Sequence, residues 1–348
     1  MRKIRGKCAA LLSALAIAAC ASSLAACSDE DDGGSGSYEW YMNVDDTITG
    51  GSISCFYYYE NETKVKVVVT AEPGYTLEAV IVTKAGGGNV DVAMVDEGVY
   101  SFTAPNAEFT VSATFRENSD VAAATGSAAA GDVILSDGTR ISASSVSAMS
   151  PAQVNKAVAV VFYSGSASGI LGERTLAVGL NTSGSVKWAL DKTDGEKNVE
   201  SIKCAPSTYN ANETAKTATF SGDTDGSDNW SALCEAVNDE ADASNYPAWT
   251  WVNQYAAANS LSGAFGDGWY MPTVAELSVL YRAESVVNRS MRRLGKEELV
   301  SSFWSSSQST REYAAYFAWA VDMISGKISD KSKSSKYSSE HVCAVRSL

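Results

Sequence analysis

The stretch Gly268–Leu277 reads GWYMPTVAEL. Its apolar opening predicts a short buried strand, and this strand stops at Pro272 because proline has no backbone N–H to donate to a sheet. Thr273 is followed three residues later by Glu276, which is the sequence pattern of a capping box. The stretch therefore predicts a buried strand that passes directly into a helix beginning after Thr273.

Two later segments extend this pattern toward the C-terminus. Phe303–Ser307 reads FWSSS and predicts the start of a strand, and His341–Arg346 reads HVCAVR and predicts a final strand. Further strands are predicted at 158–163, 175–180, 186–190 and 314–323, and helices at 150–157, 229–238, 248–258, 273–281 and 285–294. Strands that flank a helical middle without regular alternation are typical of the α+β class.

In order and spacing, these three segments resemble the C-terminal domain family of the collagen-like adhesin Lcl and the major paralogues of Fibrobacter succinogenes. In that family a G-W-x-x-P-T-x-x-E-L element precedes a W-S-S strand and a closing C-x-V-R strand. The family is a variant of the C-type-lectin fold. The resemblance implies a C-type-lectin-like domain over residues 131–348 that presents loops to a ligand, and it does not name the ligand.

The N-terminus predicts export. Residues 1–7 are basic, residues 9–19 are apolar, and LAAC follows at residues 24–27. This order resembles the lipobox of bacterial lipoprotein signal peptides, which implies removal of residues 1–26 and lipidation of Cys27. Cys20, in a weaker match, is the alternative. Residues 27–37 then form an acidic tether rich in glycine and serine, and the lipid anchor would make the membrane a partner of the protein.

The acidic run at residues 28–34 also resembles the surface-export signal of some Gram-negative lipoproteins. It implies an outer-membrane lipoprotein exposed at the cell surface, while a plain linker would leave the protein facing the periplasm. The net charge of −14 repels phosphate backbones, so no nucleic-acid partner is expected.

Residues 38–117 predict a small all-β domain, because short strands alternate with turn signals. Lys64–Ala71 and Phe109–Phe115 are its clearest strands. The segment resembles the bacterial repeat related to the internalin B-repeat, which implies a spacer or stalk. Residues 118–130 are rich in alanine, serine and glycine and predict a linker.

Four cysteines follow Cys27 in the sequence, and an exported chain meets an oxidising compartment. A disulfide between Cys204 and Cys234 would close a loop of about thirty residues and stabilise the fold by roughly 3–4 kcal/mol. A Cys234–Cys343 bridge is the alternative, because many C-type-lectin folds tie a helix to the last strand. We prefer the first pairing. Either pairing leaves one of these three cysteines over, and Cys55 belongs to the preceding all-β domain.

The segment DTDGSDN at residues 223–229 has the density of oxygen ligands that Ca²⁺ prefers. Asp223, Asp225 and Asp228 would be the ligands. The segment departs from the EF-hand loop, and aspartates of this kind also form turns and helix N-caps. A calcium site and a turn therefore both stay open, and no other cofactor is expected.

The sequence offers little for catalysis. His341 is the only histidine, which leaves at most one candidate for a zinc site or a catalytic triad. No glycine-rich phosphate loop, H-E-x-x-H or C-x-x-C motif is present. We therefore do not expect an enzyme.

The candidate binding surface consists of the loops at 308–313, 322–327 and 331–337. Tyrosine and arginine anchor interfaces well, and clustered lysines on an acidic protein suit a sulfated or acidic glycan. The predicted ligand-binding residues are Gln308, Thr310, Arg311, Tyr313, Asp322, Lys331, Lys333, Lys336 and Tyr337. We expect Trp269, Trp304 and Trp319 to pack in the core instead, because all three lie in or beside predicted strands.

Together these features predict a lipid-anchored, adhesin-like envelope protein that binds an extracellular glycan or protein without catalysis. The alternative is a structural or assembly lipoprotein that docks another envelope protein.

Overall fold

A computed structural model describes residues 42–58, 61–191, 197–207, 214–237, 243–310, 314–335 and 339–348. The chain divides into two compact units. The first contains Ile53–Val69 and Ala79–Thr114, and the second is built chiefly from Phe115–Leu348. Within the described ranges, no helix is long and apolar enough to cross a membrane.

Every regular element described before residue 118 is a strand. The strands are β1 (Met42–Val44), β2 (Gly51–Tyr58), β3 (Asn61–Ala71), β4 (Tyr75–Lys84), β5 (Ala93–Asp96), β6 (Val99–Thr103) and β7 (Phe109–Glu117). They form one sheet in the order β2-β3-β6-β5 and another in the order β1-β7-β4. Phe102 of the first sheet meets Phe109 of the second edge-on, with ring centroids 5.5 Å apart, so the two sheets share a core.

The second unit is organised around a five-stranded antiparallel sheet with the order β17-β11-β10-β8-β9. Its strands are β8 (Val133–Leu135), β9 (Arg140–Ile141), β10 (Ala157–Ser164), β11 (Thr175–Thr182) and β17 (Cys343–Ser347). The central strand β10 reads AVAVVFYS and is buried through most of its length. Such an unbroken apolar run is typical of a strand that is covered on both faces.

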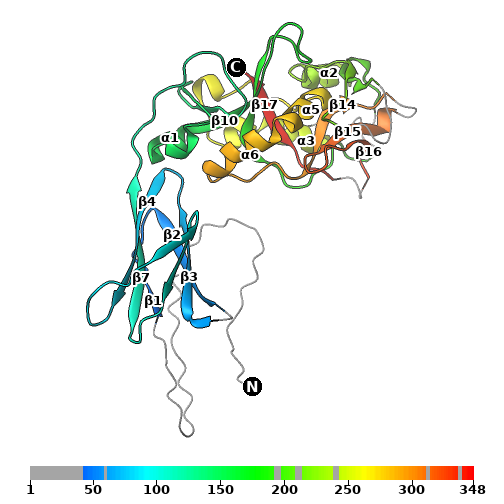
Figure 1. Cartoon of the computed structure of the whole chain (residues 1–348). Coiled ribbons are helices and arrows are strands. Elements are labelled where there is room, and N and C mark those ends of the chain that lie inside the picture. Colours follow the sequence, from blue (N-terminus) through cyan, green and yellow to red (C-terminus); the bar gives the residue numbers. More distant parts are fainter. Residues whose placement is uncertain are drawn as a thin grey trace, which may run out of the picture. The chain divides into compact units, whose positions relative to one another are not determined.

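Helices cover both faces of this sheet. On one face Val160 and Phe162 pack in a core that includes residues of α5 (Val274–Arg282) and α6 (Glu284–Arg293). On the other face Ala159 and Val161 pack in a second core with α3 (Pro247–Asn253) and α4 (Tyr255–Ala258). Figure 1 shows α5 and α6 lying against β10 and β17. The alternation of side chains along β10 thus gives each face its own core.

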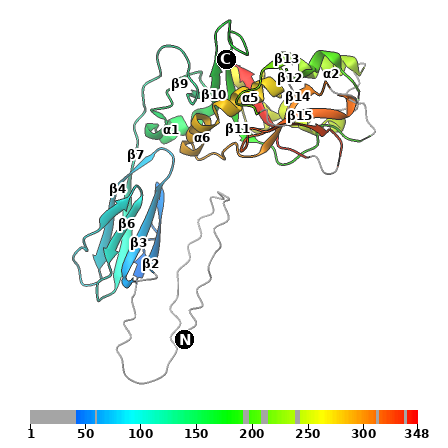
Figure 2. The ribbon, with the colours of Figure 1, turned by 45° about the vertical axis from the view of Figure 1, so that its right-hand side comes forward.

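A second, three-stranded sheet has the order β14-β15-β16. Besides α3 to α6, the helices and strands outside the central sheet are α1 (Pro151–Lys156), β12 (Cys204–Pro206), β13 (Phe220–Gly222), α2 (Asn229–Ala236), β14 (Ser302–Gln308), β15 (Phe317–Asp322) and β16 (Ile328–Ser332). Short 3₁₀ helices lie at Val146–Ala148, Glu200–Ile202, Ala243–Asn245, Gly263–Phe265 and Ala314–Tyr316. Helix α5 contacts both β10 and β14, and so lies between the two sheets (Figure 2). Separate antiparallel sheets and helices place the unit in the predicted α+β class.

The predicted helix starts are confirmed. Helix α5 begins after Thr273, whose hydroxyl accepts from the Glu276 backbone N–H while the Glu276 carboxylate accepts from the Thr273 N–H. Helix α1 has the same reciprocal box between Ser150 and Gln153, with Pro151 in its first turn. Both starts are determined within four residues of chain, which is why local sequence predicts them.

The three segments that carry the family resemblance lie next to one another. Tyr270 and Val345 exchange backbone hydrogen bonds of 2.9 Å in both directions. Trp304 donates its backbone N–H to the His341 carbonyl at 2.9 Å. The closing segment therefore contacts both the Gly268–Leu277 stretch and strand β14.

Four predicted elements differ from the structure. The strand predicted before Pro272 is only an isolated bridge between Tyr270 and Val345. The strand predicted at 314–323 is a 3₁₀ helix at Ala314–Tyr316 followed by β15. Residues 186–190 are not a strand, and Val186 makes only an isolated bridge with Glu340. The chain bends there so that Trp188 is fully buried, with its indole N–H donated to the Ser305 carbonyl. The predicted helix at 248–258 is two helices, α3 and α4, which meet at Gln254.

The predicted linker at residues 118–130 has no helix or strand. Part of it is nevertheless held in place, because the Arg140 guanidinium donates to the carbonyls of Gly126 and Ser127 and pairs with Asp132. Alanine-rich composition predicts the lack of regular structure but not these hydrogen bonds to its backbone.

Candidate functional site

The predicted binding loops are only partly within the described residues. Arg311, Tyr313, Lys336 and Tyr337 lie outside the described ranges. Gln308, Thr310, Asp322, Lys331 and Lys333 can be placed, and two of them are in the interior.

Gln308 and Lys333 are both 0% exposed, so their prediction as surface ligand contacts is wrong. Gln308 ends strand β14, where its side-chain amide accepts from the Val199 N–H at 2.9 Å and donates to the Lys197 carbonyl at 2.9 Å. The Lys333 ammonium lies over the Trp188 ring, 4.4 Å from its centroid. The Gln308 amide therefore joins the end of β14 to the segment at 197–199, and the Lys333 ammonium joins the end of β16 to Trp188.

The other three residues are more accessible. Asp322 accepts the backbone N–H groups of Ile324 and Ser325 at 2.9 and 2.8 Å and so closes a turn. Lys331 forms an ion pair with Glu340, and Thr310 is exposed after the end of β14. Internal partners thus occupy the charged groups of Asp322 and Lys331.

The predicted Cys204–Cys234 disulfide is not formed, and Cys343 is also a thiol. Cys204 is fully buried in the core on the α5 face of the central sheet, where its sulfur lies near Ala275 and Ser307. Cys234 is half-buried on α2, outside that core. Spacing along the chain could not reveal that the two side chains belong to different packing environments.

The aspartates of the predicted calcium site have other partners. Asp223 accepts the backbone N–H of Asp225, and Asp225 accepts that of Ser227 while pairing with Arg174 at 2.8 Å. Asp228 stands at the N-cap position of α2 without a side-chain capping bond. Among the residues described, no group of three or more His, Cys, Asp or Glu side chains is placed to hold a metal ion. The described side chains of this segment form turn hydrogen bonds before α2, in agreement with the turn interpretation.

A pocket of about 280 Å³ lies beside this segment, and we call it the tryptophan pocket. Its wall includes the indoles of Trp230, Trp249 and Trp269. Its polar lining includes Ser227, Ser231 and Asn253, which are all exposed. An aromatic wall with a few polar groups is the usual composition of a small-molecule site.

Three separate parts of the chain build this pocket. Helix α2 supplies Trp230 and Ser231, and helix α3 supplies Trp249 and Asn253. Trp249 and Asn253 are four residues apart, so they lie on the same face of their helix. Trp269 comes from the segment before α5. Sequence reasoning missed Trp230 and Asn253 because they come together only when the two helices and this segment pack.

The indole rings are held by neighbouring aromatic rings. Trp230 and Trp249 have ring centroids 5.6 Å apart, and Trp230 also meets Tyr246 edge-on at 5.9 Å. Behind them, Trp188 packs edge-on against Trp249 at 5.4 Å. Trp269 packs on Tyr255 at 4.7 Å. Such contacts restrict ring rotation, so the aromatic wall is formed before any ligand arrives.

One polar group in the wall lacks a partner. Trp249 is 1% exposed, and no described atom accepts a hydrogen bond from its indole N–H. Trp269, in contrast, donates its indole N–H to the Phe265 carbonyl at 2.8 Å. A buried indole N–H without an acceptor is uncommon and costs free energy.

Two anchors position the segment that carries Trp269. Arg346 donates to the carbonyls of Ala264 and Asp267 at 2.8 and 3.0 Å, and its guanidinium lies 5.6 Å from the Trp269 ring centroid. Tyr270 donates its hydroxyl to the Glu276 carboxylate at 2.9 Å. The pocket wall is thus tied to the last strand and to the start of α5.

Glu276 is fully buried at the centre of this anchoring network. Burial raises the pKa of its carboxyl group to about 7, while the Thr273 N–H, the Arg174 charge and the Tyr270 hydroxyl act in the opposite direction. These donors satisfy both carboxylate oxygens. Because Glu276 is enclosed by the chain's own groups, its role is to join segments and not to act on a ligand.

The expectation that Trp269, Trp304 and Trp319 pack in the core agrees with their burial, at 8%, 0% and 1% exposure. Trp269 has a second role, because it also lines the tryptophan pocket.

Comparison with known proteins assigns no family. No protein-family model matches the chain, and no curated protein matches it. Among solved structures, a fimbrial protein from Bacteroides ovatus is similar, with 13% sequence identity and a TM-score of 0.44 over 78% of this chain. The match covers 65% of that protein, a little less than two thirds of its length. A likeness of this size assigns neither a fold nor a function.

Proposed function

We propose that this protein is a lipid-anchored, adhesin-like envelope protein whose domain at residues 131–348 binds a carbohydrate at the tryptophan pocket. Binding is reversible and involves no catalytic step. The observation that carries the proposal is a preformed wall of three indoles beside exposed serine and asparagine side chains.

A carbohydrate fits this lining for a chemical reason. A sugar ring has an apolar face of C–H groups, which packs against an indole face, and hydroxyl groups at its edge. Ser227, Ser231 and Asn253 line the pocket with groups that donate and accept hydrogen bonds. Large apolar contact with a few directed polar groups gives both affinity and orientation.

The lining also favours binding over catalysis. Among the residues that the structure describes, no carboxylate, histidine, cysteine or lysine lines the pocket. Glycoside hydrolysis in most enzymes requires two carboxyl groups on either side of the bond that breaks. Tyr270 is the one ionisable residue in the described part of the lining, and its hydroxyl is already hydrogen-bonded to Glu276.

An N-terminal lipid anchor and a stalk would present the pocket. Lipid on Cys27 would hold the chain at the outer membrane, and the β-sheets before residue 118 would serve as a stalk. The C-type-lectin-like fold suggested by the three recurring segments belongs to the same proposal. Mass analysis of the mature N-terminus distinguishes Cys27 from Cys20. Protease treatment of intact cells removes the protein only if it faces outward.

The binding proposal is tested by applying the purified full chain to a glycan array and then titrating the best glycan. Trp230→Ala removes the half-buried indole at the pocket wall, and we expect binding to weaken by about tenfold or more. Trp251→Ala is the matched control, since Trp251 is also half-buried and packs on Tyr255 without lining the pocket.

Equal loss in both variants, or no loss in Trp230→Ala, contradicts this site. If the chain binds no glycan but captures a defined envelope protein, the assembly alternative replaces the adhesin proposal.

A further inference from the structure

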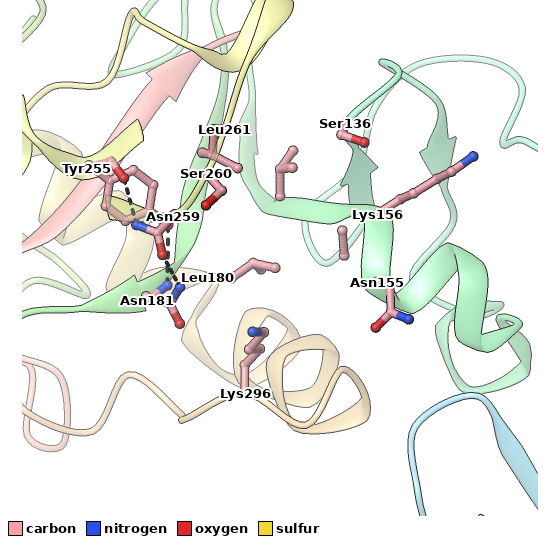
Figure 3. Close-up of a pocket in the computed structure, with 12 residues that line it drawn as sticks. Ser136, Asn155, Lys156, Leu180, Asn181, Tyr255, Asn259, Ser260, Leu261 and Lys296 are labelled. Carbon is pink, nitrogen blue, oxygen red and sulfur yellow. Dashed lines mark hydrogen bonds between the residues drawn. The ribbon is translucent and has the colours of Figure 1, made fainter. Parts of the chain in front are cut away.

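A second hollow, of about 350 Å³, lies in the same unit. It is bordered by β10, β11, helix α4 and the segment after α6, and Figure 3 shows its lining. We call it the lysine hollow, after Lys156 and Lys296. Within the described ranges of the chain, it shares no lining residue with the tryptophan pocket and is lined by no carboxylate. On a chain with net charge −14, a hollow free of carboxylates is a place where an anion meets little repulsion.

The two lysines of the hollow point in different directions. The Lys296 ammonium points into the hollow, toward Asn181 (Figure 3). It forms no ion pair or side-chain hydrogen bond with any part of the chain that the structure describes. Lys156 extends away from the others, and its ammonium lies 3.6 Å from the Asp137 carboxylate. Lys296 is therefore the cation available to a ligand.

A fixed chain of amides forms the wall near Lys296. Asn259 donates its side-chain N–H to the Tyr255 carbonyl at 2.7 Å, and its side-chain oxygen accepts from the Asn181 amide. This arrangement uses one N–H of the Asn181 side-chain amide and leaves the Asn181 side-chain oxygen as an acceptor at the hollow. The amide roles are thus determined by the network and not by the ligand.

Ser260 contributes a hydroxyl from an unusual backbone conformation. Its φ of 55° makes it the single non-glycine residue with positive φ among those described. Its side chain is exposed, and Figure 3 shows its oxygen on the side of the hollow that faces Lys296. Residues held in this region cost free energy and are common at ligand sites.

We infer that the lysine hollow binds an acidic sugar residue, with the carboxylate on Lys296 and ring hydroxyls on the Asn181 oxygen and Ser260. A simple anion would use only the ammonium group, whereas a uronate also supplies donors for the Asn181 oxygen. The hollow, of about 350 Å³, is similar in size to the tryptophan pocket and leaves room for a small ligand. This inference does not depend on the tryptophan pocket, because the two sites share no residue.

The test titrates the purified full chain with sodium glucuronate, glucose and sodium acetate, and follows binding by ligand-observed NMR. We expect glucuronate to bind more tightly than either glucose or acetate. Lys296→Gln should weaken glucuronate binding by about tenfold, the size of one charge-assisted hydrogen bond. Lys156→Gln is the matched control and should leave the affinity nearly unchanged. Both lysines are exposed, so neither variant should alter the thermal midpoint.

Three results would overturn the inference: glucose binding as tightly as glucuronate, acetate binding as tightly as glucuronate, or the same effect of both lysine variants. Trp230→Ala should leave glucuronate binding intact. The proposals for the lysine hollow and for the tryptophan pocket can therefore be refuted independently of each other.

Discussion

The guanidinium of Arg174 lies 3.1 Å from the carboxylate of Glu276, although the two residues are 102 positions apart in the chain. The same guanidinium contacts the Asp225 carboxylate at 2.8 Å and the Thr224 carbonyl at 2.9 Å. Glu276 in turn caps α5 and accepts the Tyr270 hydroxyl. This pair joins the segment before β11, the turn before α2 and the wall of the tryptophan pocket.

Glu276→Gln is expected to destabilise the protein. The Arg174 side chain is only 19% exposed, and after the substitution Asp225 is its remaining carboxylate partner. Breaking a buried ion pair from one side costs about 3 kcal/mol in the free energy of unfolding, which urea denaturation measures. Glu298→Gln is the control, because its pair with Arg292 is largely exposed and should contribute less than about 1 kcal/mol. Equal unfolding midpoints for the two variants would contradict the role given to Glu276.

Stability should also depend on pH through Glu276. Its pKa is raised from 4.5 to about 7 in the folded chain, so between these values the folded state binds more protons than the unfolded state. The free energy of unfolding should therefore fall as the pH rises through this window, by at most about 1.4 kcal/mol per pH unit. The wild type should lose more stability than Glu276→Gln between pH 5 and pH 7.5, measured by urea denaturation. Parallel pH profiles would show that this carboxyl group does not titrate in the window.

The cysteines are expected to remain thiols in the native protein. Cys204 and Cys343 are fully buried, and burial raises the pKa of each thiol to about 12. The thiolate is the reactive form, so iodoacetamide should modify neither residue until the protein is unfolded. Mass spectrometry of labelled peptides measures this, with urea-treated protein as the positive control. A disulfide-linked peptide pair, or a melting temperature lowered by reductant, would be the contrary result.

Arg346→Gln is expected to loosen the tryptophan pocket. It removes a cation placed 4.7 Å from the Phe265 ring centroid and 5.6 Å from that of Trp269. The loss of such contacts is worth about 1 kcal/mol, so glycan affinity should fall about fivefold. Tryptophan fluorescence offers a readout without ligand, since the solvent exposure of Trp269 should increase. An unchanged emission spectrum together with unchanged affinity would exclude this positioning role.

Local elements follow from local sequence. Thr273 and Glu276 predict the start of α5 because a capping box involves only four residues. The strands β10 and β11 are predicted because unbroken apolar runs suit a buried strand. The α+β class follows from the order of these elements along the chain.

The prediction of binding residues was wrong for two polar side chains that are buried in the folded chain. Gln308 and Lys333 lie in segments whose sequence is rich in serine and lysine, which is typical of exposed loops. In the folded chain Gln308 hydrogen-bonds to Lys197 and Val199, and Lys333 covers Trp188. Burial of a polar group depends on partners far away in the sequence, and no local pattern reports them.

The sequence by itself determined the capping boxes, the main strands and the scarcity of catalytic groups, because each depends on residues close together or on composition. Only the tertiary structure decided that Trp230, Trp249 and Trp269 share a pocket and that Lys296 faces a hollow while Lys156 does not. These side chains come from segments joined by long-range packing. Their meeting depends on the sum of many weak contacts across the fold, which no short stretch of sequence contains.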